Sequence, residues 1–360
     1  MNILVAELQP AKGHRNLCLH TCKILSKIGK VTLVDSLSDD ISEDKFNVIR
    51  SPFGYYQGTN KRIDIIQRTL HSVYIINFVS QIYHNGNYDI FIGITYDELA
   101  YALAWRKLRN VNVFLMQHNN FDIANHNFLK KIALKYIFSF TSIKIITQCN
   151  FIAEYAKYRY KLDSDKIIIW PHPLNIVSND IEIYDCVGIS NSNDEKIIED
   201  IIKLEEESKI FARKGLKIIL KSKSLQYDDG SLKVINGFLS EKEYNEYISK
   251  SKIIFMPFSK FFKYRMSGTL MDAFSNYKPI IVTSSPLSKA CQNVYPSIIK
   301  DYDVDSFLKS IMEFRERTDV MKKEFDRFIS FHDDSNLINI IENTIDNSLN
   351  GKIQNKFGDF

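Results

Sequence analysis

Hydrophobic residues occur along the chain in short runs that alternate with longer amphipathic stretches. The first run covers 2–6, an amphipathic stretch follows over 16–28, and a second run covers 30–34. Short apolar runs favour buried β-strands, whereas apolar positions three and four residues apart favour helices. The start of the chain therefore predicts a strand, a helix and a second strand.

This alternation continues to about residue 170. Further strands are predicted over 89–94, 111–116 and 144–147, and further helices over 98–108 and in the segment that ends near residue 160. Strands that alternate with helices are typical of a parallel sheet that helices cover on both faces.

A domain boundary is predicted just after the strand over 167–170. The next segment, PHPLN at 171–175, contains two prolines, which neither a helix nor a central strand tolerates. Beyond it the pattern starts again, with strands over 186–189, 216–220, 232–235, 252–256 and 279–283 and helices over 194–212, 241–249 and from 267. We therefore predict domains over 1–172 and 173–332, and a terminal amphipathic helix and tail over 333–360 that can cross back to the first domain.

Composition places the chain among globular proteins, since 45% of its 360 residues are apolar and 25% are charged. It contains no run of eighteen apolar residues and no signal peptide, so we expect a cytoplasmic protein. The five cysteines are scattered without CxxC spacing and are interpreted as reduced thiols. Acidic pairs at 39–40, 228–229 and 303–305 are typical of turns, so no metal and no other cofactor is expected.

The net charge of +4 hides a difference between the two halves. Residues 1–172 contain 21 Lys and Arg against 14 Asp and Glu, whereas the remainder contains 26 against 29. A basic half favours an anionic partner such as a membrane surface, a lipid phosphate or a nucleic acid. No nucleic-acid-binding module is visible. The stretch FLKKIALKYIFSF at 128–140 could lie in a membrane interface or pack its apolar face on the sheet.

The strongest local signal is YRMSGTLMDAFSNYKPIIVT at 264–283. Here Ser267, Gly268 and Thr269 form a turn of small residues that opens a helix. Backbone N–H groups at a helix start are unpaired and carry partial positive charge, and small side chains let a phosphate approach them. The turn therefore suits a diphosphate, although the same residues also make an ordinary helix cap.

This stretch resembles the donor-binding element of GT-B glycosyltransferases, especially family 4 (glycosyl transferases group 1). Other segments resemble that family in the same order, namely FLMQHNN at 114–120, SIKIIT at 142–147, KIIIWPHP at 166–173 and VINGFLSEKEYNEYISKSKIIFMP at 234–257. The resemblance runs from about 114 to 285, nearly half of the chain. It implies the GT-B fold, in which two doubly wound Rossmann-like domains face each other across a cleft.

The resemblance also implies roles for individual residues. Asp272 matches the carboxylate that accepts hydrogen bonds from the donor ribose, with the start of an ordinary helix as the alternative. The turn that lies against the base corresponds to Gly237, Phe238 and Leu239. His118 matches a histidine that faces the transferred sugar, with a purely structural role as the alternative. Gly13 and His14 lie in the loop after the first strand, where His14 could act as general base, contact the acceptor or simply be exposed.

Two departures from the family pattern bear on chemistry. Retaining members have a second glutamate where this chain has Tyr264, and the family's basic pair is missing from 188–196. The stereochemical outcome therefore stays open. A leaving diphosphate still needs positive charge, for which Lys221 and Arg265 are the preferred candidates; Lys223 could equally be a solvated surface lysine.

The resemblance implies a metal-independent enzyme that transfers a sugar, a hexose in our expectation, from a UDP- or GDP-linked donor. We expect a glycan or lipid-linked oligosaccharide as acceptor, in the synthesis of a bacterial surface polysaccharide such as capsule, O-antigen or exopolysaccharide. Peripheral contact with the cytoplasmic face of the inner membrane fits the basic first half. The alternatives are a non-catalytic partner subunit of the same fold and a sugar-nucleotide epimerase. A nicotinamide enzyme is disfavoured because the first loop lacks the GxGxxG pattern.

Overall fold

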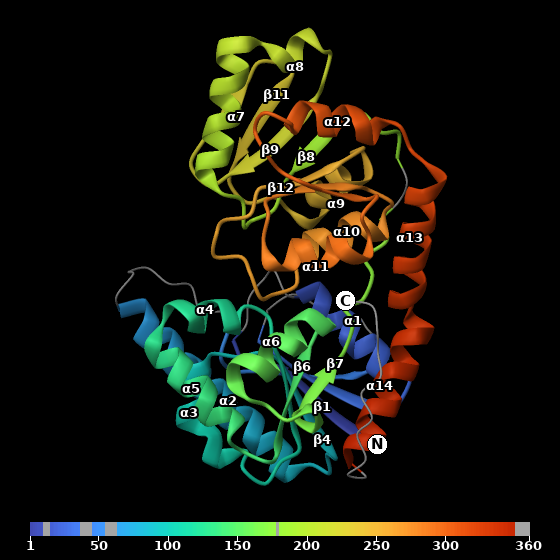
Figure 1. The fold of residues 1–360 in the computed structure, drawn as a ribbon. Coiled ribbons are helices and arrows are strands. Elements are labelled where there is room, and N and C mark those ends of the chain that lie inside the picture. The colour runs from blue at the N-terminus through green and yellow to red at the C-terminus, as the bar shows by residue number, and fades with distance from the viewer. Residues whose placement is uncertain (10–14, 37–44, 55–62, 178–179, 350–360) are drawn as a thin grey trace. The chain divides into compact units, whose positions relative to one another are not determined.

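The fold was analysed in a computed structural model, which describes residues 1–9, 15–36, 45–54, 63–177 and 180–349 (Figure 1). The chain divides into two compact units. Unit 1 comprises Met1–Pro173 together with the segment that starts at Asp334, and unit 2 comprises Leu174–Asp333. Each unit is built around one seven-stranded sheet.

The sheet of unit 1 is entirely parallel and has the strand order β3-β2-β1-β4-β5-β6-β7. Its central strands are almost completely buried, as expected for a sheet covered on both faces. The strands are β1 (Asn2–Glu7), β2 (Lys30–Asp35), β3 (Asn47–Arg50), β4 (Ile90–Thr95), β5 (Val113–Met116), β6 (Ile143–Thr147) and β7 (Ile167–Ile169).

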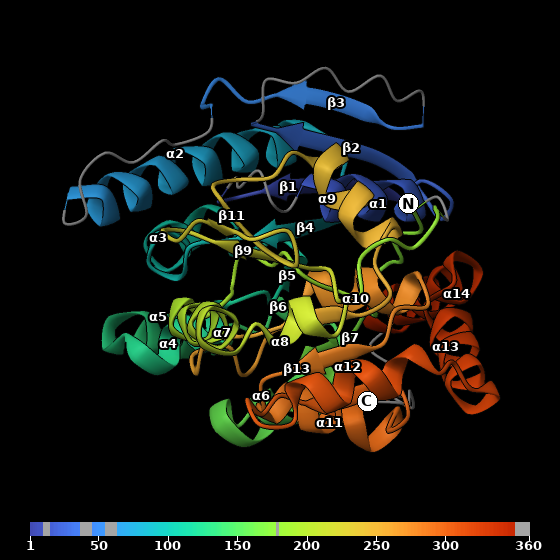
Figure 2. The ribbon, with the colours of Figure 1, turned by 90° about the horizontal axis from the view of Figure 1, so that it is seen from above.

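Helices cover both faces of this sheet. One layer consists of α2 (Ile63–Asn85), α3 (Glu98–Ala104) with the 3₁₀ turn Trp105–Lys107, and α5 (Phe128–Phe138), in which α3 packs against both of its neighbours. On the other side, α1 (Arg15–Leu25) packs against α14 (Asp334–Leu349), as the two views of Figures 1 and 2 show. The unit is completed by α4 (Asn120–His126) and α6 (Asn150–Tyr160).

The C-terminal helix α14 belongs to the core of unit 1. Its residues Leu337, Ile341 and Ile345 lie in one apolar cluster with Val5 of β1 and Cys22 of α1. The spacing of the three α14 residues puts them on one face of the helix. Unit 1 is therefore assembled from the two ends of the chain.

The sheet of unit 2 has the strand order β10-β11-β9-β8-β12-β13-β14, and only the edge strand β10 is antiparallel. Its strands are β8 (Cys186–Gly188), β9 (Ile218–Ser222), β10 (Tyr227–Asp228), β11 (Leu232–Asn236), β12 (Ile254–Met256), β13 (Ile280–Val282) and β14 (Ile299–Asp301). Its helices are α7 (Glu195–Ser208), α8 (Ile210–Arg213), α9 (Glu241–Ser249), α10 (Gly268–Ser275), α11 (Pro286–Val294), α12 (Phe307–Arg315) and α13 (Asp319–His332).

The two parallel, helix-covered sheets confirm the predicted fold class of two Rossmann-like domains. Two local predictions were wrong. The single helix predicted over 194–212 is interrupted at Lys209, which adopts a left-handed φ of 49° and separates α7 from α8. Lys221 was expected just past its strand but lies inside β9. Within the described ranges, no helix combines the length and the apolarity that a bilayer crossing requires.

A buried ion triad joins α5 to the start of α3. The ammonium group of Lys130 lies 2.8 Å from Asp97 and 2.7 Å from Glu98, and all three side chains are buried. Burial works against the charge on Lys130, but the carboxylates of Glu98 and Asp97 raise its pKa. Asp97 also caps α3, because its Oδ1 accepts a hydrogen bond from the Ala100 N–H at 3.0 Å.

Replacing Lys130 with methionine should destabilise unit 1 strongly. Two buried carboxylates would lose their cation, which costs about 3–5 kcal/mol in comparable buried pairs. Urea denaturation would measure the loss, with Lys131→Met, one residue along the same helix, as the control. Equal stability of the two variants would show that the triad contributes nothing beyond the packing of the lysine stem.

Candidate functional site

The order of the strands identifies the edge of each sheet where a ligand is expected. In unit 2 the chain passes from β8 to β9 on one side and later places β12 on the other side of β8. In unit 1 the corresponding position lies between β1 and β4. Sheets of this type bind ligands beyond the carboxyl ends of the strands at such a switch point.

The loops that leave β8 and β12 in unit 2 are tied together. The side-chain amide of Asn193 donates to the carbonyls of Gly188 at 2.8 Å and Lys221 at 2.9 Å. The N–H of Asp194 donates to the carbonyl of Pro257 at 2.6 Å. At position 188 a Cβ atom would come within 3.2 Å of the Phe255 carbonyl, so close approach of the strands requires glycine. The switch point is therefore a compact backbone framework.

Lys221 supplies a cation at this edge. Its side chain is buried and its ammonium group donates to the amide oxygen of Asn191 at 2.6 Å. The aromatic ring of Phe238 lies 5.9 Å from the same ammonium group. Burial, followed by the charge of Lys223, lowers the pKa of Lys221. Because Lys221 forms no ion pair with a described carboxylate, its charge is suited to an incoming anion.

The start of α10 lies after β12 at the same edge. Ser267 caps the helix, since its hydroxyl accepts from the Leu270 N–H at 3.2 Å. A Cβ atom at Gly268 would meet nothing within 4 Å, so the first turn of α10 is open at this position. Nearby, the guanidinium of Arg265 lies over the ring of Phe262 at 4.1 Å. Tyr264 lies half-buried in the same loop.

Asp272, in the second turn of α10, has two protein partners that the sequence did not reveal. Its Oδ2 accepts from the Tyr244 hydroxyl at 2.7 Å and its Oδ1 accepts from the Asn175 amide at 3.1 Å. Burial raises its pKa to about 6, while these two hydrogen bonds act in the opposite direction. A carboxylate offers about four acceptor positions, so two remain for a ligand.

The turn after β11 completes the set in unit 2. Gly237 has a φ of 105°, which residues other than glycine rarely adopt. Phe238, the next residue of the turn, is 72% exposed. Leu239 is half-buried behind it. The structure therefore places all the predicted donor residues of unit 2 at, or just beyond, the carboxyl edge of one sheet.

In unit 1, His118 follows β5 at the carboxyl edge and is half-buried. The backbone N–H of His118 donates to the side-chain oxygen of Asn120 at 3.3 Å. The amide of Asn120 in turn donates to Glu98 at 2.8 Å, which connects this edge to the buried triad. The other two predicted residues of unit 1, Gly13 and His14, lie outside the described residues.

Glu7 is a candidate that sequence reasoning missed. It ends β1 beside the switch point, it is only 4% exposed, and its Oε1 has no hydrogen-bond partner among the residues that the structure describes. Burial, followed by the charge of Asp35, raises the pKa of Glu7 to about 8, although Arg15 acts against this. Asp35 itself is paired with Arg15 at 3.3 Å and Arg50 at 2.5 Å. An acid with a pKa near neutrality can exchange a proton under working conditions.

The described residues contain no group of three His, Cys, Asp or Glu side chains that could hold a metal ion.

Comparison with known proteins rests on structure alone. No protein-family model matches the chain, and no curated protein sequence matches it. Among solved structures, HepE (Alr3699) of Anabaena in complex with UDP and glucose is similar at 12% identity and a TM-score of 0.64, over 96% of this chain and 99% of that one. Arabidopsis thaliana UGT89C1 in complex with quercetin is similar at 11% identity and 0.61, over 96% and 98%.

A glycosyltransferase from Rickettsia africae ESF-5 is similar at 13% identity and a TM-score of 0.56, over 99% of both chains. Coverage of nearly the whole length shows that both units and their order along the chain are shared. The chain therefore has the GT-B fold, in two Rossmann-like units.

Replacing Glu7 with glutamine should remove a pH dependence of stability. The pKa of Glu7 is about 8 in the folded protein against the ordinary value of 4.5, so the folded state holds a proton that the unfolded state releases between these values. The wild type therefore loses stability as the pH rises through this window, on the order of a few kcal/mol, and the loss ends above it. Urea midpoints of the two proteins should diverge with rising pH, with Glu7→Gln the more stable.

Glu207→Gln is the control, because it makes the same substitution at an exposed position of α7. Parallel curves for wild type and Glu7→Gln would mean that Glu7 is charged in the folded protein.

Proposed function

We propose that the protein is a glycosyltransferase that moves a sugar, a hexose in the simplest case, from a UDP- or GDP-linked donor to a glycan or lipid-linked acceptor. The observation that carries the proposal is the carboxyl edge of unit 2, where Lys221, the open start of α10 and Asp272 lie at the switch point of one sheet. Known proteins of the same fold support it, since one was solved with UDP and glucose.

Each part of the donor has a matching group in this proposal. The diphosphate binds to the N–H groups at Ser267, Gly268 and Thr269, with Lys221 and Arg265 as cations. The ribose diol donates to the free acceptor positions of Asp272. The base lies against the backbone of the turn at 237–239, and a backbone contact there leaves the choice between uracil and guanine open.

The transfer breaks the bond between the sugar C1 and the donor phosphate and forms one to an acceptor hydroxyl. The leaving diphosphate gains negative charge in the transition state, and Lys221, Arg265 and the start of α10 stabilise that charge without a metal. The hydroxyl loses a proton, for which His118 and His14 are the proposed acceptors. Tyr264 stands where retaining relatives have a carboxylate, so this chain brings a neutral phenol to that position.

The acceptor belongs, in this proposal, to a bacterial surface polysaccharide such as capsule, O-antigen or exopolysaccharide, assembled on a lipid carrier. The excess of Lys and Arg over Asp and Glu in residues 1–172 supports an anionic acceptor or surface on the side of unit 1. The protein would then work at the cytoplasmic face of the inner membrane.

Donor binding is tested by thermal stabilisation with UDP, GDP and a panel of their sugar conjugates. One base should raise the melting temperature by several degrees, and Asp272→Asn should lose most of that shift because an amide keeps only one acceptor oxygen. Asp305→Asn, on an exposed loop of the same unit, is the control and should respond like the wild type. Absence of any shift with all donors would contradict the proposal.

Product analysis separates transfer from the alternatives. Consumption of the stabilising donor only in the presence of an acceptor indicates transfer. Conversion of the donor to a second nucleotide sugar without acceptor would indicate an epimerase, and tight donor binding without any turnover would indicate a non-catalytic subunit.

Lys221→Met should weaken binding of the nucleoside diphosphate while leaving the much weaker binding of the free nucleoside unchanged. The methionine keeps the packing of the lysine stem and removes the charge that faces the phosphates. Titration calorimetry should show a loss of about tenfold or more for the diphosphate. Lys223→Met, two residues away and exposed, is the matched control, and an equal loss in both variants would assign the effect to general charge.

A further inference from the structure

Large apolar side chains are exposed on three adjoining helices of unit 1. Leu103 of α3 is 71% exposed, and α3 packs between α2 and α5. On α2 the exposed residues are Ile65, Ile66, Leu70 and Tyr74, and on α5 they are Phe128, Leu129, Ile132 and Tyr136. We call these nine residues the apolar face. Exposed apolar side chains gathered on neighbouring helices are typical of an interaction site.

Helix α5 shows that this exposure is not a by-product of core packing. Ala133, Leu134 and Ile137 on its inner side are buried in the unit. Phe128, Ile132 and Tyr136 follow one another at intervals of four on the outer side and are exposed. The helix therefore has apolar residues on two sides, and packing against the sheet uses only one of them.

Cations outnumber acids at the border of the apolar face, where Asp64 lies in the first turn of α2. Lys131 and Lys135 lie on α5, Arg106 and Lys107 follow α3, and Arg68 lies on α2. None of these five forms an ion pair with a described carboxylate, and α5 contains no acidic residue. An apolar surface with lysine and arginine at its margin matches the interface of an anionic bilayer, where apolar side chains enter and cations meet the headgroups.

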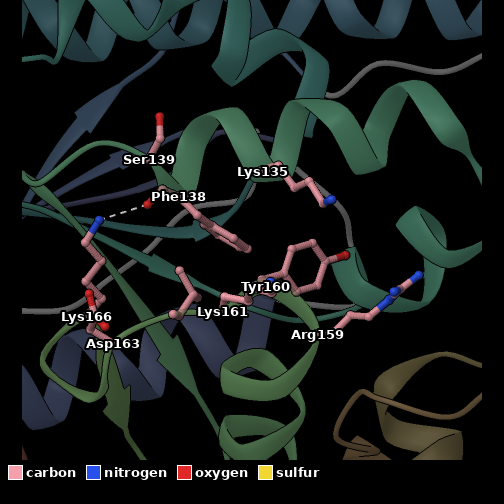
Figure 3. A pocket seen from close by; sticks show the side chains of 9 residues that line it. Lys135, Phe138, Ser139, Arg159, Tyr160, Lys161, Asp163 and Lys166 are labelled. Atoms are coloured by element: carbon pink, nitrogen blue, oxygen red, sulfur yellow. Dashed lines mark hydrogen bonds between the residues drawn. The ribbon is translucent and has the colours of Figure 1, made fainter.

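A basic pocket adjoins this border (Figure 3). It has a volume of about 320 Å³ and lies between the C-terminal ends of α5 and α6. Lys135, Arg159, Lys161 and Lys166 line it, against a single acid, Asp163. Lys166 is engaged, since its ammonium group donates to the carbonyls of Phe138 at 2.9 Å and Phe140 at 3.3 Å.

The other three cations of the pocket have no described hydrogen-bond partner. In Figure 3, Lys135 from α5 and Arg159 from α6 extend to the same end of the pocket, on either side of the Tyr160 ring. Two cations that converge and form no ion pair with a described carboxylate can bind a phosphate group. Lys135 also belongs to the border of the apolar face, so the pocket and the face form one continuous surface.

We propose that the apolar face and the basic pocket together are the surface by which unit 1 binds an anionic bilayer. The apolar side chains enter the interface, and Lys135 and Arg159 hold a lipid phosphate. This deepens the proposed function by giving the acceptor a membrane location. Membrane binding itself does not depend on the proposed function, but its role in sugar transfer rests on it.

The direction of the helices connects this surface to the acceptor edge. Phe128 and Leu129 lie in the first turn of α5, which follows β5 and α4, and Ile65 and Ile66 lie in the first turn of α2, which follows β3. Helices that return between parallel strands begin near the carboxyl ends of those strands. The apolar face therefore begins at the edge of the sheet where a lipid-linked acceptor would be bound.

Sedimentation with vesicles tests the surface. The full-length protein should bind vesicles of phosphatidylcholine with about a third phosphatidylglycerol, bind neutral vesicles far less, and be released by salt. Phe128→Ser with Ile132→Ser, and separately Lys135→Glu with Arg159→Glu, should each weaken binding at least about tenfold. The matched controls are Met312→Ser with Val320→Ser and Lys322→Glu with Lys323→Glu in unit 2, which change exposed apolar area and charge similarly.

The outcomes separate a bilayer from a free anion. Inorganic phosphate should release the protein no better than sodium chloride of equal ionic strength. Strong release by phosphate together with normal binding by the serine variant would overturn the proposal in favour of a free-anion site. Equal binding by all variants, or no binding of the wild type at low salt, would also overturn it.

Vesicle binding is measured without nucleotide and donor stabilisation is measured without vesicles. A failure of the membrane surface is thus distinguishable from a failure of the glycosyltransferase assignment, and the donor-induced shift shows in addition that each variant is folded.

Discussion

Parallel strand pairing is the constraint on which both units depend. Because consecutive strands run in the same direction, the chain must return across a face of the sheet after each strand, and helices on both faces result. The same constraint brings every carboxyl end to one edge, so loops far apart in sequence meet there. In unit 2 it places Lys221 of β9 beside Asn191 of the loop after β8, thirty residues away.

The two switch points differ in charge, and burial amplifies the difference. At the edge of unit 2 a buried lysine without a carboxylate partner lies near the open start of a helix, which favours an anion. At the edge of unit 1 a buried glutamate with an unpartnered oxygen lies at the end of β1. The poorly solvated charge of Lys221 costs free energy in the empty protein, and an anionic ligand that pairs with it recovers that cost. Glu7, by contrast, holds a proton near neutral pH because burial raises its pKa to about 8.

The exposed side of α5 in unit 1 is not explained by the needs of folding. The inner side of α5 packs against the unit, and Lys130 is neutralised by Asp97 and Glu98, so the needs of folding are met there. The outer side has exposed apolar residues and cations that form no ion pair with a described carboxylate. Apolar area that stays exposed to water adds little to stability and is explained more simply by a partner.

The sequence by itself determined the elements whose signals are local. The strands over 232–235 and 252–256, the capped helix over 241–249 and the small-residue start of α10 were all predictable, because alternation, caps and turns depend on neighbours a few residues apart. Local patterns did not reveal the long helix α2, because its exposed apolar residues make its two sides alike in polarity. They also did not reveal the break in the helix at Lys209. Only the tertiary structure decided that Asp272 is held by Tyr244 and Asn175, that Oε1 of Glu7 is buried with no hydrogen-bond partner among the described residues, and that one side of α5 is exposed. Each of these depends on residues that the fold brings together or keeps apart.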